Sequence, residues 1–403
     1  MSEFQHYQFA VDAPLTDGQL AEIGALTTRA RLTRHSFVNT YGWGDFKGDP
    51  RALVETHYDA YLYFANWGTR QVILRWPATA MPLDEAAPYV AGYSATAWES
   101  DGHVLLHLKS DPEDEMEDFN DLFDHGDGNG TGEQWLPSIT QARHLVAEGD
   151  LRLLYLVWLL CLQSGELDDD ALEPAVPPGL AALPLPQPLT DLATFLRIDA
   201  DLIAAAARRS AQPEPRPSLA AHRAWIAALD PGGKDAVLAQ LLHDSDTQAA
   251  LSALRRRFRD TQSATGPDPA PRTVAELRAA ALAQTATRIA REERQETQER
   301  ERAAQEARHA QDLRLADLQE DPEAGWTRVG ELLAVRGTRH YREVVRLLGD
   351  LAALADRDGT TSAFTARYAQ FITAHRTKKA LLRDLRAGGP ACDALIALTP
   401  ARG

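Results

Sequence analysis

The sequence has few of the residues that crosslink or anchor a protein. Only two cysteines occur among its 403 residues, Cys161 and Cys392, and the first lies in an apolar run, where a reduced, buried thiol is expected. Residues 1–4 lack the basic start and apolar core of a signal peptide. The most apolar run, 153–162, has ten residues, whereas a membrane helix needs about 20. We therefore expect a cytoplasmic protein without a membrane span.

The sequence also lacks the short motifs that carry much of catalytic chemistry. It contains no HExxH, CxxC or GxSxG, and no GxGxxG after a strand. Residues 232–235 (GGKD) lack the first glycine and the Ser or Thr of a phosphate-binding loop. Arginine outnumbers lysine by 37 to 5, a bias typical of a GC-rich, bacterial genome. The absence of a catalytic signature favours a non-enzymatic role, and no cofactor is predicted.

The net charge of −16 is concentrated in one part of an otherwise ordinary composition. Residues 101–175 hold 18 acids and three bases, while the other segments nearly cancel. The densest part, 111–134, is acidic and glycine-rich, which predicts a loop. Such a block repels phosphate backbones and attracts a basic partner or a cation. A solvated loop that aids solubility is the alternative.

The first 110 residues show both strand and helix signals. Thr16 and Gln19 have the spacing of a capping box. Asp49-Pro50 predicts the start of a helix that continues to about Trp67-Gly68. Strands are expected at 3–11, 71–76, 95–99 and 103–109, the last two joined at Asp101-Gly102. Residues 1–110 are therefore predicted to form a small α+β domain with a partly antiparallel sheet.

From residue 135 onward the apolar spacing is helical. Helices are expected at 136–148, 151–164, 188–197 and 199–210, within a region 135–210 that has a proline-rich connection at 174–188, and a small helical unit is expected at 218–261. Residues 272–320 predict one long charged helix, and 321–403 a C-terminal helical bundle. Residues 291–302 contain no apolar residue, so this helix has no coiled-coil seam and is predicted to be a solvated spacer. The fold class is thus an α+β N-terminal domain followed by mainly α structure.

The most unusual local sequence is 41–49 (YGWGDFKGD), in which glycine alternates with aromatic and charged residues. Aromatic side chains in such a loop supply binding area at low entropic cost. The candidate binding residues are Trp43, Asp45, Phe46, Lys47 and, from another turn, Trp67. Asp45 and Lys47 also match a fragment of a nuclease pattern. A rigid connector whose rings pack under the sheet is the alternative.

Two groups of residues are candidate metal ligands. His103 and His107 lie four apart on a predicted strand and so share a face, near the acids of the acidic segment. Asp127 and Asn129 begin a sequence like an EF-hand loop, but Ser138 occupies the position that requires a bidentate Glu. A divalent metal is therefore an open possibility, beside structural histidines and a flexible glycine-rich loop.

Basic clusters are candidates for nucleic-acid contacts. One spans 255–259, and the other comprises Arg376, Lys378, Lys379, Arg383 and Arg386. Neither lies in a known reading motif. Docking on an acidic segment of the same protein or of a second copy is the alternative.

The stretches YQF, WGDFKGDP and YLYFANWG, with LYLVWLLCLQSGELDDDALEPAVPPGL, resemble an uncharacterised family of bacterial proteins. The resemblance covers about the first half of the chain and implies no activity, cofactor or site residue. The pattern as a whole favours a cytoplasmic interaction or adaptor protein with a protein partner. A metal-dependent hydrolase or nuclease using the N-terminal acids and histidines, and a nucleic-acid-associated regulator working through the basic C-terminal helix, are the alternatives.

Overall fold

The computed structural model describes residues 4–111, 132–181, 184–211, 217–243, 251, 254–258, 261, 271–335 and 339–390. The chain divides into two compact units, residues 1–288 (unit 1) and 289–403 (unit 2). Most of the predicted acidic loop, 112–131, lies outside the described residues.

Unit 1 is built on a seven-stranded sheet with the order β2-β3-β1-β4-β5-β7-β6. Every neighbouring pair is antiparallel. The strands are β1 (Gln5–Ala10), β2 (Arg31–Leu32), β3 (Ser36–Tyr41), β4 (Ala60–Ala65), β5 (Arg70–Pro77), β6 (Ala95–Ser100) and β7 (His103–Ser110). The first strand in the sequence thus lies inside the sheet, where Gln5 is opposite both Tyr41 and Ala65.

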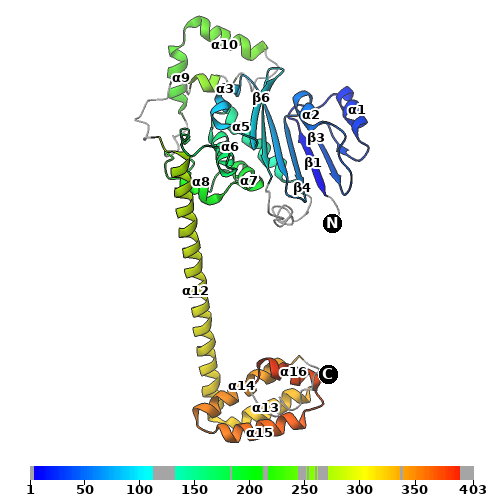
Figure 1. The fold of residues 1–403 in the computed structure, drawn as a ribbon, viewed down its shortest axis with the longest axis vertical. Coiled ribbons are helices and arrows are strands. Elements are labelled where there is room, and N and C mark those ends of the chain that lie inside the picture. Colours follow the sequence, from blue (N-terminus) through cyan, green and yellow to red (C-terminus); the bar gives the residue numbers. More distant parts are fainter. Residues whose placement is uncertain are drawn as a thin grey trace. The chain divides into compact units, whose positions relative to one another are not determined.

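Successive side chains of each strand point to opposite faces of the sheet, and both faces are covered. Face A carries an aromatic core that includes Tyr7, Phe9, Phe37, Tyr61 and Tyr63, and it packs against α1 (Asp17–Leu26) and α2 (Pro50–Thr56). Face B carries an aliphatic and aromatic core against α5 (Trp135–Ala147), α6 (Arg152–Gln163) and α7 (Gln187–Phe195). Figure 1 shows the sheet with these two sets of helices on either side.

Local signals place several elements correctly. Thr16 and Gln19 form the predicted capping box at the start of α1. The Asp49 side chain accepts hydrogen bonds from the backbone of Arg51 and Ala52 and so caps α2. The turn between β6 and β7 has φ values of 46° at Asp101 and 71° at Gly102, as the predicted hairpin requires.

The helix predicted from Asp49 to about Gly68 is wrong in its second half. It ends at Thr56, and residues 60–65 (AYLYFA) form β4, whose side chains are all buried. A central strand covered on both faces loses the alternation of apolar and polar residues that usually identifies a strand. The aromatic residues of this run favour an extended backbone. β3 was not predicted at all.

The helices that follow share a core with the sheet. Residues 153–162 of α6 are all buried, as expected of a core helix. The core of face B joins β4, β5 and β7 to α5, α6, α7, α8 (Ala200–Ala207) and the start of α12 (Val274–Glu320). Residues 1–110 and 135–210, expected as separate regions, are therefore packed into one body. Short helices α3 (Leu83–Ala86) and η1 (Ala87–Tyr89) also contribute to this core.

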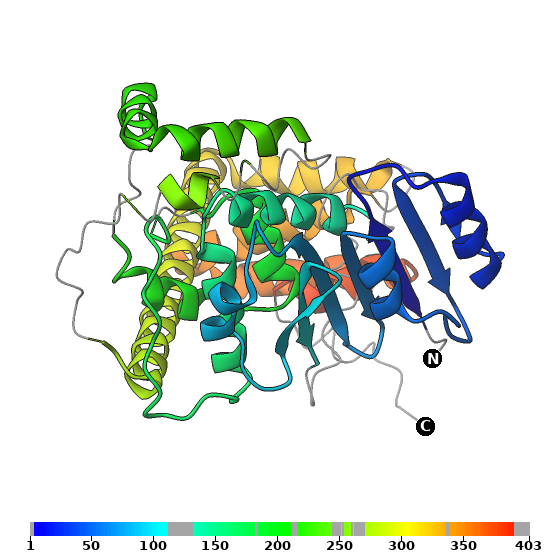
Figure 2. The same ribbon diagram turned by 90° about the horizontal axis from the view of Figure 1, so that it is seen from above.

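Two helices lie at the periphery of unit 1. α9 (Leu219–Ala228) has no buried residue, and α10 (Pro231–His243) follows it. Both views show this pair projecting from the rest of unit 1 (Figures 1 and 2). The helical residues 254–258 pack Phe258 against Trp225 of α9, with ring centroids 5.4 Å apart. Arg255 and Arg256 form ion pairs with Glu148 and Glu85.

The start of α12 is tied to unit 1 by a buried ionic cluster. The Glu173 carboxylate, with 2% of its side chain exposed, lies 2.6 Å from Arg272 Nη2 and 3.6 Å from Arg209 Nη1. The Tyr155 hydroxyl donates to the same carboxylate. Because a buried charge requires partners, these contacts hold the residues before α12 in one place.

The middle of α12 is solvated, and unit 2 has a core of its own. Every residue from 291 to 310 is exposed, as predicted for a helix without an apolar seam. Unit 2 contains α13 (Pro322–Ala334), α14 (Tyr341–Arg357), α15 (Thr361–Ala374) and α16 (Lys379–Gly388). Val344, Leu348, Tyr368, Ile372 and Leu381 are at the centre of this bundle. Among the described residues, no helix combines the length and apolar composition that crossing a membrane requires.

Candidate functional site at the aromatic end of the sheet

One end of the sheet gathers exposed aromatic side chains. β3 and β4 end there, β1 lies between them, and β5 and β6 begin there. Trp43 follows β3, Trp67 follows β4 and Tyr93 precedes β6, with exposed fractions of 70%, 48% and 67%. In the described part of the chain, several large hydrophobic side chains are exposed, and these three are the aromatic ones. We call this surface, defined by Trp43, Trp67 and Tyr93, the aromatic end.

The register places the ends of β3 and β4, from which Trp43 and Trp67 follow, on either side of β1, although 24 positions separate the two tryptophans. β3 and β4 are both neighbours of β1, and adjacent strands lie about 4.8 Å apart, so the two strand ends are about 10 Å apart. Isolated exposed aromatic residues are common on proteins, but several at the same end of a sheet are typical of an interaction surface.

The loop that carries Trp43 is held from beneath by Gln5. Its Nε2 donates to Asp45 Oδ1 at 2.7 Å and to the Gly44 carbonyl at 3.2 Å. Its Oε1 accepts from the hydroxyls of Tyr7 at 2.6 Å and Tyr63 at 3.0 Å. Burial and the charge of Asp45 raise the pKa of Tyr7 to about 12, so its hydroxyl remains a donor. This chain of bonds fixes the Gly44–Asp45 backbone.

Phe46 anchors the same loop in the core of face A. Its ring is buried and packs 5.5 Å from the rings of Tyr7 and Phe37. A Cβ placed on Gly48 would lie 2.5 Å from the Phe46 ring, so the loop requires glycine there. Of the predicted binding residues, Phe46 and Asp45 therefore support the loop. Trp43 and Lys47 are exposed on it.

At the aromatic end, the rings of Trp43 and Tyr93 each contact a cationic side chain of the same chain. The Arg29 guanidinium lies 4.6 Å from the Trp43 ring centroid, and Lys109 Nζ lies 4.2 Å from that of Tyr93. Lys109 is also paired with Asp111 at 2.8 Å. These contacts restrain the rings without burying them, because cations are attracted to aromatic faces.

Trp67 sits in a tight turn between β4 and β5. The Gly68 N–H donates to the Ala65 carbonyl, and the Ala65 N–H donates to the Thr69 carbonyl, both at 3.0 Å. Gly68 has a φ of 100°, which favours glycine. Its carbonyl accepts from Arg197 Nη1 at 2.9 Å. The tryptophan is thus presented on a short, bonded turn.

The predicted histidine pair shares a face but not a site. His103 and His107 both lie on face A of β7, four residues apart, and such residues are about 13 Å apart along a strand. His103 Nδ1 lies 2.9 Å from the Asp101 carbonyl, and His107 Nε2 lies 3.2 Å from Gln71 Oε1. Burial lowers the pKa of His107. In the described part of the chain, no three His, Cys, Asp or Glu side chains are grouped so as to hold a metal ion.

The other two predicted metal ligands, Asp127 and Asn129, lie outside the described residues. Metal binding by that segment stays a prediction.

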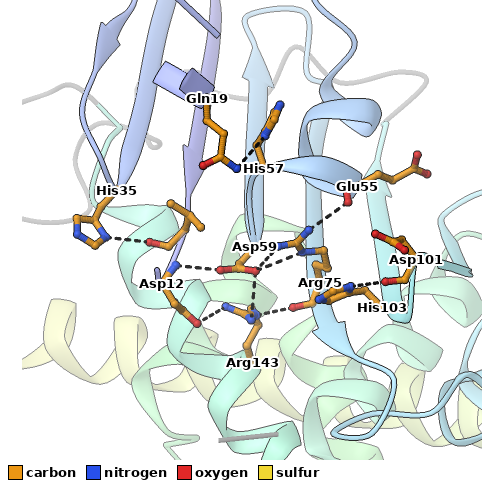
Figure 3. A network of polar contacts seen from close by, with 11 residues as sticks. Asp12, Gln19, His35, Glu55, His57, Asp59, Arg75, Asp101, His103 and Arg143 are labelled. Carbon is orange, nitrogen blue, oxygen red and sulfur yellow. Dashed lines mark hydrogen bonds and ion pairs between the residues drawn. The ribbon is translucent and has the colours of Figure 1, made fainter. Parts of the chain in front are cut away.

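A second polar cluster lies at the opposite end of the sheet (Figure 3). Asp59 accepts from Arg75 Nη2 and from the Asp12 N–H, both at 2.9 Å, while Arg143 Nη1 donates to Asp12 Oδ2 at 2.9 Å. Burial raises the pKa of Asp59, but the charges of Arg143 and Arg75 outweigh this and lower it overall. Two acids and two arginines neutralise one another here, so we assign the cluster to joining α5 to the sheet.

The predicted nucleic-acid residues of unit 2 are divided between structural and exposed positions. Lys378 Nζ donates to the Leu333 carbonyl at 3.1 Å, and Arg383 pairs with Asp384 at 3.0 Å. Arg376 and Lys379 are exposed. In unit 1, the basic residues Arg255 and Arg256 meet acids of the same chain, as described above.

Comparison with known proteins adds no relative: no family model, no curated protein and no solved structure matches the chain.

Proposed function

We propose that the chain is an interaction protein that binds a protein partner at the aromatic end of unit 1. The observation that supports this is that Trp43, Trp67 and Tyr93, all strongly exposed, lie at the same end of the sheet. Tryptophan and tyrosine contribute most of the binding energy in many interfaces. Exposing them to water is unfavourable for the free protein, so a partner that covers them gains hydrophobic area.

The rigidity of the Trp43 loop supports the same proposal. Gln5 and Phe46 fix its backbone from two sides. A side chain that is already ordered before binding loses little further entropy when a partner covers it. A flexible solvated loop would give no such advantage.

The organisation of the rest of the chain is consistent with an adaptor. Unit 2 has a separate core, and residues 291–310 of α12 are exposed throughout. An adaptor requires modules that fold around their own cores, and both units meet this condition. A cytoplasmic location belongs to the same proposal, and the free, buried thiol of Cys161 supports it.

The test is selection of peptides from a random display library on the full-length protein, followed by affinity measurement. We expect the selected peptides to lose at least about tenfold in affinity to Trp43→Ala and to Trp67→Ala, since interface hot spots contribute that much. Leu242→Ala is the matched control, because Leu242 is 89% exposed but lies on α10. Peptides that bind both tryptophan variants as well as the control would refute the proposal, as would the failure of any peptide to bind.

The two alternative functions have less structural support than the interaction protein. A metal-dependent hydrolase or nuclease and a nucleic-acid-associated regulator remain hypotheses from the sequence. No contact in the described residues favours either one over the aromatic end.

A further inference from the structure

We infer that the partner binds unit 1 as an extended strand that pairs with the outer edge of β6. This inference rests on the proposed function and specifies how the partner is held. β6 is the last strand of the sheet, and β7 is its neighbour (Figure 1). It begins at the aromatic end, because Tyr93 lies two residues before Ala95. A strand added to β6 would therefore have one end beside Tyr93.

The ladder between β6 and β7 determines which backbone groups face outward. The Lys109 N–H donates to the Ser94 carbonyl at 2.8 Å, in register with the consecutive pairs of the ladder. Since bonded residues alternate along an antiparallel pair, Ser94 and every second residue after it bond to β7. The N–H and C=O groups of Ala97 and Glu99 therefore point away from β7. Within the described residues, these groups have no hydrogen-bond partner.

The two edges of the sheet differ in how they resist pairing with another chain. Unpaired strand edges bind other strands, and many proteins prevent this with very short edge strands, proline, lysine or a bulge. The opposite edge is β2, which has two residues. β6 (ATAWES) has six, with no proline or lysine, and its unbroken register contains no bulge. Its charged residue, Glu99, lies next to its end. Of the two edges, β6 is therefore the one that can accept a strand.

The side chains of β6 suit an added strand on both faces of the sheet. On face A, Thr96 is exposed and Trp98 is half-buried. The Arg51 guanidinium lies 4.0 Å from the Trp98 ring centroid, and Trp98 Nε1 donates to Glu55 Oε1 at 2.7 Å, so this ring is held in place. On face B, the outward residue Ala97 is small, and α3 and η1 belong to the core beneath the strand. An added strand would place alternate side chains beside Trp98, where aromatic and β-branched residues pack well.

Unpaired N–H and C=O groups that alternate along a strand are complementary to another extended backbone. Backbone pairing supplies affinity that depends little on sequence, and Tyr93 and Trp98 add side-chain area. A helix on the partner could cover the aromatic end but could not satisfy the outward groups of β6. The occupant is therefore an extended segment of another protein, about as long as β6, with aromatic or β-branched side chains at alternate positions.

Amide hydrogen exchange, measured by NMR on the full-length protein, tests the pairing directly. Without a partner, the amides of Ala97 and Glu99 should exchange at least about tenfold faster than those of Thr96 and Trp98, which bond to β7. A peptide selected from the display library should slow exchange at Ala97 and Glu99 by at least about tenfold, because each amide then has a backbone bond that must open first. A peptide that covers only the exposed rings would leave these two amides unchanged.

A proline variant tests the same edge through affinity. Ala97→Pro removes one outward N–H and leaves the bonds between β6 and β7 in place, because an edge strand tolerates proline where its nitrogen faces outward. It should weaken the selected peptide about fivefold, the effect of one lost backbone hydrogen bond. Leu219→Pro is the control: it places proline at the first position of the peripheral helix α9, where proline is favoured, and should leave affinity unchanged. If Ala97→Pro fails to fold, N-methylation of the peptide replaces it. Methyl groups on one alternate set of its amides should weaken binding, and those on the other set should not.

Several outcomes would overturn the inference, and they are distinct from failure of the proposed function. If library peptides require Trp43 and Trp67 but leave exchange at Ala97 and Glu99 unchanged, the proposed function stands and this inference is wrong. Equal binding to the two proline variants, or equal effects of the two methylated sets, also contradicts it. If the protein without peptide already protects these two amides, its own chain or a second copy occupies the edge, and the inference is wrong. The proposed function fails separately if the peptides bind the two tryptophan variants as well as the Leu242 control.

Discussion

Acidification is expected to destabilise unit 1 through His6. This side chain lies on β1 at face B, with 1% of its residue surface exposed, and its ring stacks 4.8 Å from that of Phe64. Nδ1 lies 3.2 Å from the Thr40 hydroxyl, while Nε2 has no hydrogen-bond partner within the described residues. Burial lowers the pKa of His6 from 6.5 to about 4, and the charge of Glu133 opposes only part of this effect.

The sign and size of the effect follow from the two pKa values. The folded value lies below the unfolded one, so the unfolded chain takes up the proton first as pH falls. The stability that depends on neutral His6 is complete above about pH 6.5 and is lost between there and pH 4. Since one pKa unit corresponds to about 1.4 kcal/mol, unit 1 should lose about 2 kcal/mol between pH 7 and pH 5.

Urea unfolding followed by tryptophan fluorescence measures this loss. Seven of the eight tryptophans lie in unit 1, so the signal reports chiefly on that unit. His6→Asn keeps a donor near Thr40 but does not titrate in this range, and it should remove the part of the pH dependence between 7 and 5 that comes from His6, leaving the part that comes from His107. It should also be less stable at pH 7, because the contact with Phe64 is lost.

The test compares how much the free energy of unfolding changes with pH in the His6 variant and in a control variant. His144→Gln alters an exposed histidine of α5 and should retain the full pH dependence of the unaltered protein. If the His6 variant loses as much free energy between pH 7 and pH 5 as the unaltered protein does, the assignment to His6 is wrong.

Two further perturbations test the supports of unit 1. Arg143→Met should lower the free energy of unfolding in urea at pH 7 by about 3–5 kcal/mol, because Asp59 then stays buried with one charged partner fewer. Arg51→Met breaks an exposed ion pair and should lower it by under about 1 kcal/mol. Equal losses in the two variants would contradict the role of Arg143 as the charged partner of buried Asp59. Gly48→Ala should destabilise unit 1 by about 1–3 kcal/mol, since the new Cβ displaces the Phe46 ring. An unchanged unfolding midpoint for Gly48→Ala would show that the loop is looser than its contacts indicate.

The elements predicted correctly are those that depend on neighbours in the sequence. The capping box of α1 and the turn at Asp101-Gly102 each follow from a few consecutive residues, and the charged α12 follows from the composition of one continuous stretch. β4 was mistaken for helix because a strand buried on both faces shows no alternation, and the cap at Asp49 begins a helix without determining where it ends.

The candidate site was predicted only in part, because local sequence does not show which strands are neighbours in the sheet or which side chains are buried. Trp43 and Trp67 stand out in glycine-rich stretches, but their proximity depends on β1 lying between β3 and β4, which no local signal reveals. Phe46 looked like a binding residue because an aromatic side chain in a loop gives no indication of its burial. Tyr93 escaped notice, since its place at this end depends on the pairing of β6 with β7 in the sheet.

The place of β1 inside the sheet has a consequence for synthesis of the chain. Residues 5–10 are synthesised before their partners in β3 and β4, which extend to residue 65. Until β4 has been synthesised, at least one edge of this strand, five of whose six residues are buried in the folded protein, stays open, and open strand edges are prone to aggregate. Nascent chains that do not yet include β4 should therefore depend on chaperones, whereas β3 closes one edge of β1 and β4 closes the other.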